Sequence, residues 1–179
     1  MIVIEEPPAP PVTLAEMKAF LRIGSGEEDA LLATLARSAG EMCERFTGRS
    51  LLARDVTETL PASTAWTRLG AAPVRGIDGV EAVDAAGGAA ALPADAYAID
   101  IDAAGDGWVR VLRAAGAKQV RVAYSAGMAA EIETLPEALR HGVVRLAAHL
   151  YTHRDRHDGA GPPAAVTALW RPWRRLRLR

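Results

Sequence analysis

The spacing of apolar residues changes period twice along this chain of 179 residues. Residues 52–125 hold short runs in which apolar and polar side chains alternate, a period of two that is typical of half-buried strands. The segments on either side repeat their apolar residues every three or four positions, as amphipathic helices do. Because the flanking helices must pack on each other, the β region reads as an insertion. The pattern predicts an α+β fold.

The inserted region contains five runs with strand character, separated by clusters of Pro, Gly and Asp: "DVTETL", "VEAVDA", "YAIDID", "GWVRVL" and "QVRVAY". This arrangement predicts an antiparallel meander of five or six strands. The stretch "DIDAAGDG" (Asp100–Gly107) begins like a calcium-binding loop, but Ala104 and Val111 stand where such a loop needs oxygen ligands. We therefore expect a turn between two strands there.

Three helices are predicted from the S/T-x-x-E pattern of a capping box, in which the first side chain and the Glu satisfy each other's backbone N–H groups. The pattern occurs at Thr13–Glu16, Ser25–Glu28 and Thr134–Glu137. An apolar stripe follows each one; the first ends before Gly24 and the second at Gly48. A shorter helix is expected over Ala164–Trp170, ended by Pro172.

These elements divide the chain into four predicted parts. They are an N-terminal helical part (1–51), an inserted antiparallel β region (52–125), a helix that packs on the first helices (126–158), and a last part (159–179). The last part comprises a linker, the short helix and an extended C-terminal arm. The expected architecture is thus a helical bundle with a β insertion and an arm.

No cluster of residues points to catalysis, to a metal or to a cofactor. His149, His153 and His157 follow helical spacing and two of them could share a metal, but "HLYTH" lacks the Glu of a zinc protease helix. A solvated helix end explains these residues better. Cys43 lies on an apolar stripe, which favours an inert core thiol, and a lone cysteine fits a reducing cytoplasm. We expect neither an enzyme nor a bound metal or cofactor.

The closing sequence "LWRPWRRLRLR" (Leu169–Arg179) combines Trp, Leu and Arg, the first and last of which dominate binding hot spots in protein interfaces. Residues 134–179 carry nine basic and three acidic side chains, whereas residues 1–133 carry twelve and nineteen. If the last residues are extended, Leu176 and Leu178 lie on one face and arginines on the other. The segment is typical of an arm that completes a partner's sheet or groove.

Three other readings of this tail stay open. A frayed terminus explains the arginines but explains the tryptophans and leucines poorly. The tail can also fold back on its own domain. Duplex DNA is the competing partner, because five arginines would neutralise about five phosphates. A DNA-packaging accessory protein that binds duplex through its basic C-terminal region is therefore the alternative function.

Several segments, in their order and spacing, resemble the head–tail connector (adaptor) proteins of tailed phages and the related adaptors of gene transfer agents. The matching stretches are "PVTLAEMKAFLRI", "EEDALLATLARSAGEMCERFTGRSL", "VAYSAGM", "LPEALRHGVVRLAAHLYTHR" and "AAVTALWRPWRRLRL". They cover the helical ends, a little over half of the chain. The β region matches in layout more than in residues.

The resemblance implies a structural ring, usually of twelve copies, beneath the portal protein at one capsid vertex of a virion or gene transfer agent particle. Such a ring, assembled in the bacterial cytoplasm, joins the portal to a tail-side stopper or tail terminator protein. DNA passes through its centre without sequence-specific binding, and no membrane is involved. The resemblance also implies that the arm docks on the portal, through Trp170, Arg171, Trp173, Arg174, Arg175, Leu176, Arg177, Leu178 and Arg179.

Overall fold

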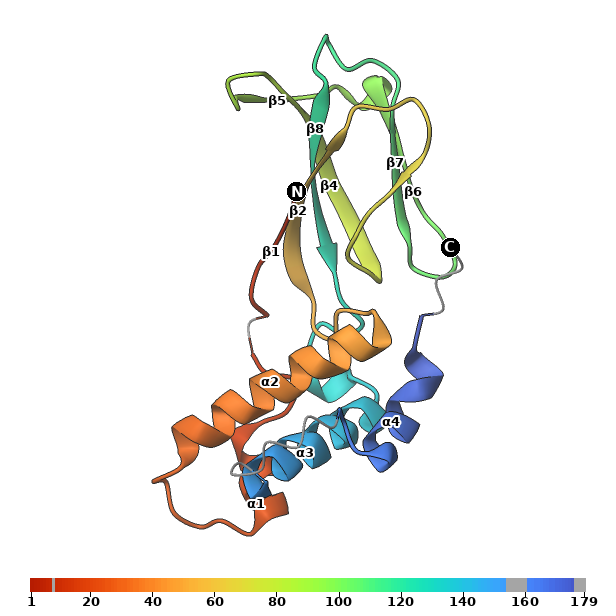
Figure 1. Cartoon of the computed structure of the whole chain (residues 1–179). Coiled ribbons are helices and arrows are strands. Elements are labelled where there is room, and N and C mark those ends of the chain that lie inside the picture. Colours follow the sequence, from red (N-terminus) through yellow and green to blue (C-terminus); the bar gives the residue numbers. More distant parts are fainter. Residues whose placement is uncertain (8, 154–160, 176–179) are drawn as a thin grey trace. The chain divides into compact units, whose positions relative to one another are not determined.

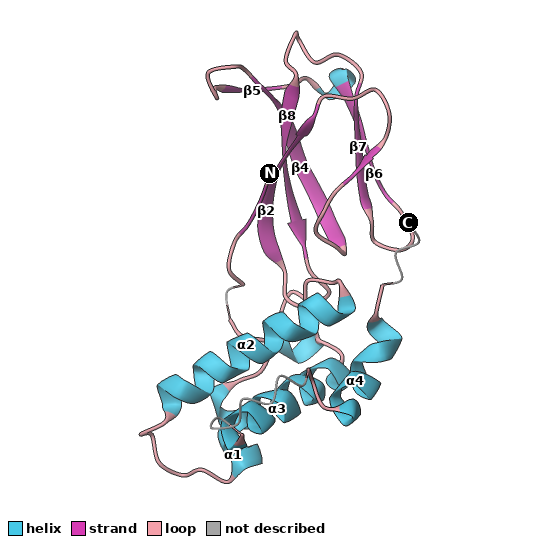
Figure 2. Ribbon diagram, in the orientation of Figure 1, coloured by secondary structure: helices cyan, strands magenta, loops and turns pink. Residues whose placement is uncertain are grey.

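The computed structural model describes residues 1–7, 9–153 and 161–175, which form two compact units (Figure 1). The β unit comprises Met1–Pro7 and Ala53–Met128, and the helical unit comprises Pro8–Leu52 and Ala129–Arg179. The named strands fall within the residue ranges of the β unit and the α-helices within those of the helical unit; Figure 2 colours the two kinds of element. The predicted α+β fold is confirmed.

The helical unit packs its four described α-helices around one apolar core, with α2 against α3 and α4 against α3. The helices are α1 (Leu14–Leu21), α2 (Asp29–Thr47), α3 (Glu137–Thr152) and α4 (Ala164–Trp170). Short 3-10 turns η2 (Ile132–Thr134) and η3 (Arg171–Trp173) precede α3 and follow α4. The largest side chains of this core that are fully buried are Met17, Leu32, Leu51, Leu135, Leu139, Leu146, Val12 and Trp170.

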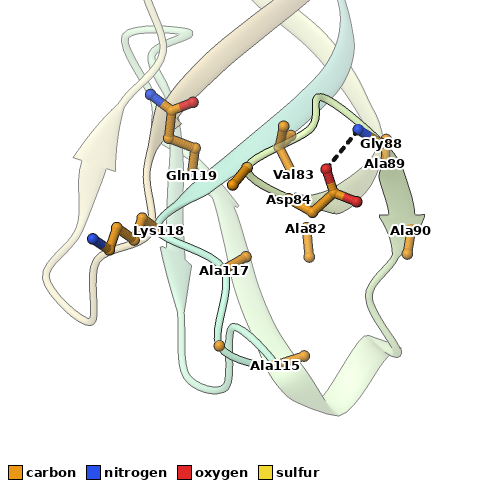
Figure 3. A pocket seen from close by; sticks show the side chains of 12 residues that line it. Ala82, Val83, Asp84, Gly88, Ala89, Ala90, Ala115, Ala117, Lys118 and Gln119 are labelled. Atoms are coloured by element: carbon orange, nitrogen blue, oxygen red, sulfur yellow. Dashed lines mark hydrogen bonds between the residues drawn. The ribbon is translucent and has the colours of Figure 1, made fainter.

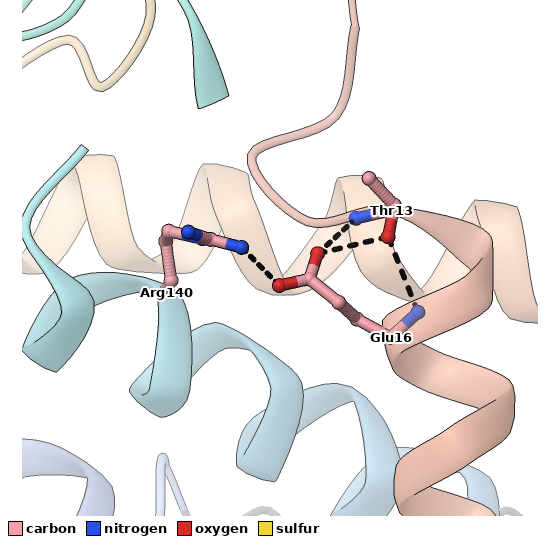
Figure 4. Close-up of polar contacts among 3 residues, drawn as sticks. All are labelled: Thr13, Glu16 and Arg140. Atoms are coloured by element: carbon pink, nitrogen blue, oxygen red, sulfur yellow. Dashed lines mark hydrogen bonds and ion pairs between the residues drawn. The ribbon is translucent and has the colours of Figure 1, made fainter. Parts of the chain in front are cut away.

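The capping box at the start of α1 is present as predicted. The Thr13 hydroxyl accepts from the Glu16 N–H at 3.1 Å, and a Glu16 carboxylate oxygen accepts from the Thr13 N–H at 2.8 Å. Arg140, from α3, donates to the other oxygen of the same carboxylate (Figure 4). The box therefore also ties α1 to α3.

The other two predicted capping boxes are wrong. α2 begins at Asp29, after a turn closed by the Asp29 N–H on the Gly26 carbonyl, so Ser25 lies too early to cap it. α3 begins at Glu137 because the ring of Pro136 keeps the preceding residue extended, which prevents a helix from starting at Thr134. The Thr134 hydroxyl instead donates to the Glu131 carbonyl.

The β unit contains two sheets in which all pairs of named strands are antiparallel. One sheet has the order β1-β2-β8-β4-β5 and the other the order β3-β7-β6. The strands are β1 (Ile2–Ile4), β2 (Arg54–Pro61), β3 (Thr67–Arg68), β4 (Val74–Val83), β5 (Ala89–Ala91), β6 (Tyr97–Ile101), β7 (Gly107–Val111) and β8 (Gln119–Ala126), with a 3-10 turn η1 (Ala94–Ala96) before β6.

The predicted meander order is wrong, although the antiparallel pairing is right. β8 lies between β2 and β4, so the last strand of the unit occupies the middle of the larger sheet. Alternation of apolar and polar side chains indicates that a strand is half-buried, but it does not determine which strand pairs with it. The short strands β3 and β5 carry too few residues to show a period.

The first strand was not expected from the sequence. Ile2, Val3 and Ile4 are all exposed, so the segment has no alternation to reveal it, yet it pairs with β2. The part predicted as residues 1–51 therefore differs in the structure, where the first seven residues belong to the β unit.

Alternation does describe the core of the β unit. Val120, Val122 and Tyr124 of β8 are buried, whereas the residues between them are more exposed. One buried carboxylate, that of Glu58, accepts from the Tyr124 hydroxyl at 2.9 Å and from the Gly70 N–H at 2.8 Å. Burial raises the pKa of Tyr124 above its ordinary value, so the phenol keeps the proton that it donates.

Candidate docking segment at the carboxyl end

The short helix α4 places Trp170 inside the helical unit. The indole is 0 % exposed, its centroid lies 5.8 Å from that of Phe46, and its Nε1–H donates to the Leu139 carbonyl at 3.4 Å. Gly142 of α3 leaves room for the ring, because a Cβ at that position would stand 2.1 Å from Nε1. The expectation that Trp170 is an exposed anchor therefore differs from the structure, in which this residue holds α4 in place.

The residues after α4 follow the C-terminal end of α2. The Arg175 N–H donates to the Thr47 carbonyl at 2.8 Å, and the Arg49 guanidinium donates to the Trp173 carbonyl at 3.1 Å. The Arg174 guanidinium lies over the Phe46 ring, 5.7 Å from its centroid. One main-chain hydrogen bond and one from the Arg49 side chain thus fix the base of the predicted arm on its own unit.

The described side chains of this segment remain accessible in part. Arg171 and Arg174 are exposed, and Trp173 and Arg175 are half-buried. The last four predicted docking residues, Leu176, Arg177, Leu178 and Arg179, lie outside the described residues. The reading that the tail folds back on its own domain is correct as far as Arg175.

The histidine and cysteine side chains that the structure describes offer no second site. His149 and His153 stack with centroids 4.2 Å apart, and His157 lies outside the described residues. Among the residues that the structure describes, no group of three or more His, Cys, Asp or Glu side chains is placed to hold a metal ion. Cys43 is fully buried in the helical core, and this burial raises the pKa of its thiol.

A hollow of about 770 Å³ lies in the β unit between the β4–β5 turn and residues 115–119 (Figure 3). Its lining is mostly Ala and Gly. The Asp84 carboxylate already accepts from the Ala86 and Gly88 N–H groups of the turn, both at 2.8 Å. In Figure 3 the Lys118 side chain extends away from Asp84. No pair of groups suited to acid–base chemistry lines this hollow.

Comparisons with known proteins point to one kind of assembly. The family described as "Phage gp6-like head-tail connector protein" matches residues 11–70. None of the curated proteins matches the chain at a significant level. Of the helices in the described part of the chain, none is long and apolar enough to cross a membrane.

Three solved structures contain a chain similar to this one over 100 % of its length and 97 % of theirs. The first is the neck of an empty gene transfer agent particle computed with C6 symmetry, at 29 % identity and a TM-score of 0.79. The second is the virion of a native gene transfer agent particle, at 30 % identity and a TM-score of 0.79. The third is the neck of a native particle computed with C12 symmetry, at 28 % identity and a TM-score of 0.78.

Proposed function

Because this chain belongs to the head–tail connector family of tailed phages and gene transfer agents, we propose that it is a structural adaptor of the particle neck. It forms a ring, of twelve copies as the family resemblance implies, that seats beneath the portal and joins it to a stopper or tail terminator protein. The observation that carries this proposal is the full-length similarity to chains found in neck structures.

A ring gives this architecture a role that needs no catalytic centre. A closed ring repeats one contact between two different patches of the same chain. C6 and C12 symmetry in the necks that contain similar chains supports such a closed arrangement. The role of this chain is then geometric, and DNA passes through the ring.

We propose a portal-docking part of the arm that is narrower than the nine residues expected from the sequence. Trp170 lies in the core, the Arg49 guanidinium donates to the Trp173 carbonyl, and the Arg175 N–H donates to the Thr47 carbonyl. The groups left for a partner are the exposed arginines Arg171 and Arg174, together with the last four residues. We propose that these groups contact the portal, where Arg side chains give bidentate hydrogen bonds to carboxylates.

Deletion of Leu176–Arg179 tests this assignment while leaving every described contact of Trp170, Trp173 and Arg175 in place. We expect the shortened chain to unfold at the same temperature as the full chain and to lose binding to purified portal rings. A matched variant with Leu176→Ser and Leu178→Ser keeps the charges and tests the apolar half alone. Portal binding at full strength by the shortened chain would overturn the docking role.

A DNA-packaging accessory function is less well supported. Family membership favours a connector, and no described surface combines the arginines of the tail with a row of aromatic side chains on which bases stack. The net negative charge of residues 1–133 also disfavours DNA binding, because the phosphates repel it.

A further inference from the structure

Strand β6 forms a free edge of the three-stranded sheet: within the described part of the chain it pairs with β7 and with no other strand. Ile99 and Ile101 lie on the same side of this sheet as the buried Val109 of β7, but they are 44 % and 40 % exposed. The reason is that no further strand covers them. Two apolar side chains and a row of backbone groups are therefore available for pairing.

The residue between the two isoleucines carries a free charge. Asp100 is exposed and has no hydrogen bond or ion pair to any residue that the structure describes. The next carboxylate, that of Asp102, differs because it accepts from the Ala104 and Asp106 N–H groups and from the Trp108 indole. The exposed edge of β6 thus has the sequence Ile-Asp-Ile, and the Asp100 carboxylate has no partner among the described residues.

The sequence contains a segment with the opposite pattern, "LRL" at residues 176–178, directly after the main-chain bond that holds Arg175. We propose that the free edge of β6 binds this C-terminal segment of a second copy of the chain as an added strand. With Arg177 beside Asp100, the leucines on either side of Arg177 fall beside Ile99 and Ile101, whichever way the segment runs. The backbone supplies hydrogen bonds, and the alternating side chains supply the register.

The second copy is the occupant because its tail carries the opposite charge and the matching alternation of apolar side chains. This step rests on the proposed function, which brings copies of the chain together in a ring. The segment is also part of the proposed portal-docking arm. A segment bound to β6 is not available to the portal, so the two sites compete for it.

Disulfide trapping between full-length chains tests the pairing directly. One preparation carries Asp100→Cys and the other Arg177→Cys, and the two are mixed under mild oxidation. We expect a cross-linked dimer that contains one chain of each kind. The native Cys43 does not interfere because it is fully buried. Asp78→Cys, an exposed position on the interior strand β4, is the matched control and should not cross-link. If Asp78→Cys cross-links to Arg177→Cys as well as Asp100→Cys does, the proposed pairing is wrong.

Charge reversal tests the recognition. A labelled peptide of residues 173–179 should bind full-length chain with an affinity about tenfold lower when the chain carries Asp100→Arg, and a peptide with Arg177→Asp should restore it. Charged residues on edge strands also discourage uncontrolled aggregation. If Asp100 has that role alone, the reversal will leave the peptide affinity unchanged, and the proposal falls.

Portal binding separates this inference from the proposed function. The Asp100→Arg chain keeps its arm and should bind portal rings at least as well as the native chain. Normal portal binding without any peptide binding to β6 would remove the inference and leave the adaptor role standing. If the chain binds the peptide at β6 but never binds portal rings, the adaptor role is removed and the pairing at β6 remains.

Discussion

Gly142 lies directly against the indole of Trp170, and the two residues join α3 to α4. A Cβ at position 142 would stand 2.1 Å from the indole nitrogen and 2.8 Å from two ring carbons, distances that real Cβ atoms do not reach. The C-terminal helix is therefore packed through a position that needs the absence of a side chain.

Gly142→Ala should destabilise the helical unit by about 1–3 kcal/mol, because the added methyl group forces the indole out of its site. The free energy of unfolding in urea measures this cost. Gly24→Ala is the control, since a Cβ there meets nothing within 4 Å. An unchanged stability of Gly142→Ala would show that α4 does not pack on α3 as described.

Trp170→Ala should cost more, about 3–5 kcal/mol, because it opens a cavity in the same core. Trp173→Ala, which removes a half-buried side chain three residues further along the chain, should cost clearly less. If the two substitutions have equal effects on unfolding, Trp170 is not the residue that anchors α4.

The carboxylate of Glu16 should make stability depend on pH. Burial alone would raise its pKa, but hydrogen bonds from the Thr13 N–H and hydroxyl and from Arg140 outweigh burial and lower the pKa below its ordinary value. The unfolded chain therefore takes up the proton at a higher pH than the folded chain. The stabilisation is complete above a pH of about 4.5 and is lost as the pH falls through the lower folded value.

Glu16→Gln should accordingly be less stable than the native chain at neutral pH, and the difference should shrink as the pH falls below about 4.5. Urea unfolding at a series of pH values measures it. Glu41→Gln, at an exposed position on α2, is the control and should change stability by less than about 0.5 kcal/mol throughout. A difference for Glu16→Gln that stays constant with pH would contradict the assignment.

Tyr124→Phe should destabilise the β unit by about 1.5–3 kcal/mol, because the buried Glu58 carboxylate loses a hydroxyl donor. The substitution also leaves the Ala71 N–H without its acceptor. Tyr97→Phe removes a hydroxyl from a half-buried ring for which no hydrogen bond is described, and it should be nearly neutral. Equal stabilities of the two variants would show that Glu58 does not depend on Tyr124.

Duplex DNA should not be retained by the isolated chain at about 50 mM salt. If the five arginines of the tail did bind phosphates, the logarithm of the affinity would fall with the logarithm of salt concentration at a slope of about −4.5. A filter-binding titration measures this slope. A steep slope that disappears on deletion of residues 171–179, which contain all five arginines, would favour the DNA-binding alternative.

Several elements were predictable from the sequence because their signals are local. The Thr13–Glu16 box, the stop of α2 at Gly48 and the span of α4 all depend on residues within one or two turns of helix. β1 could not be predicted, since its exposed isoleucines and valine are explained only by a partner strand more than fifty residues away.

The candidate docking segment was also predictable from the sequence only in part. Its composition indicated a tail rich in groups for partner binding, and family membership agrees with a role in a neck assembly. The sequence did not reveal that Trp170 belongs to the core, because burial of an indole requires a facing gap, and the gap is the missing side chain of Gly142 on another helix.

The sequence by itself determined the α+β class, the helical ends and the alternating strands, since these follow from short-range spacing and capping. Tertiary structure alone decided the place of β8 between β2 and β4, the burial of Trp170 and the free edge at β6. The physical reason is that pairing and burial depend on residues distant in the chain, which only the folded molecule brings together.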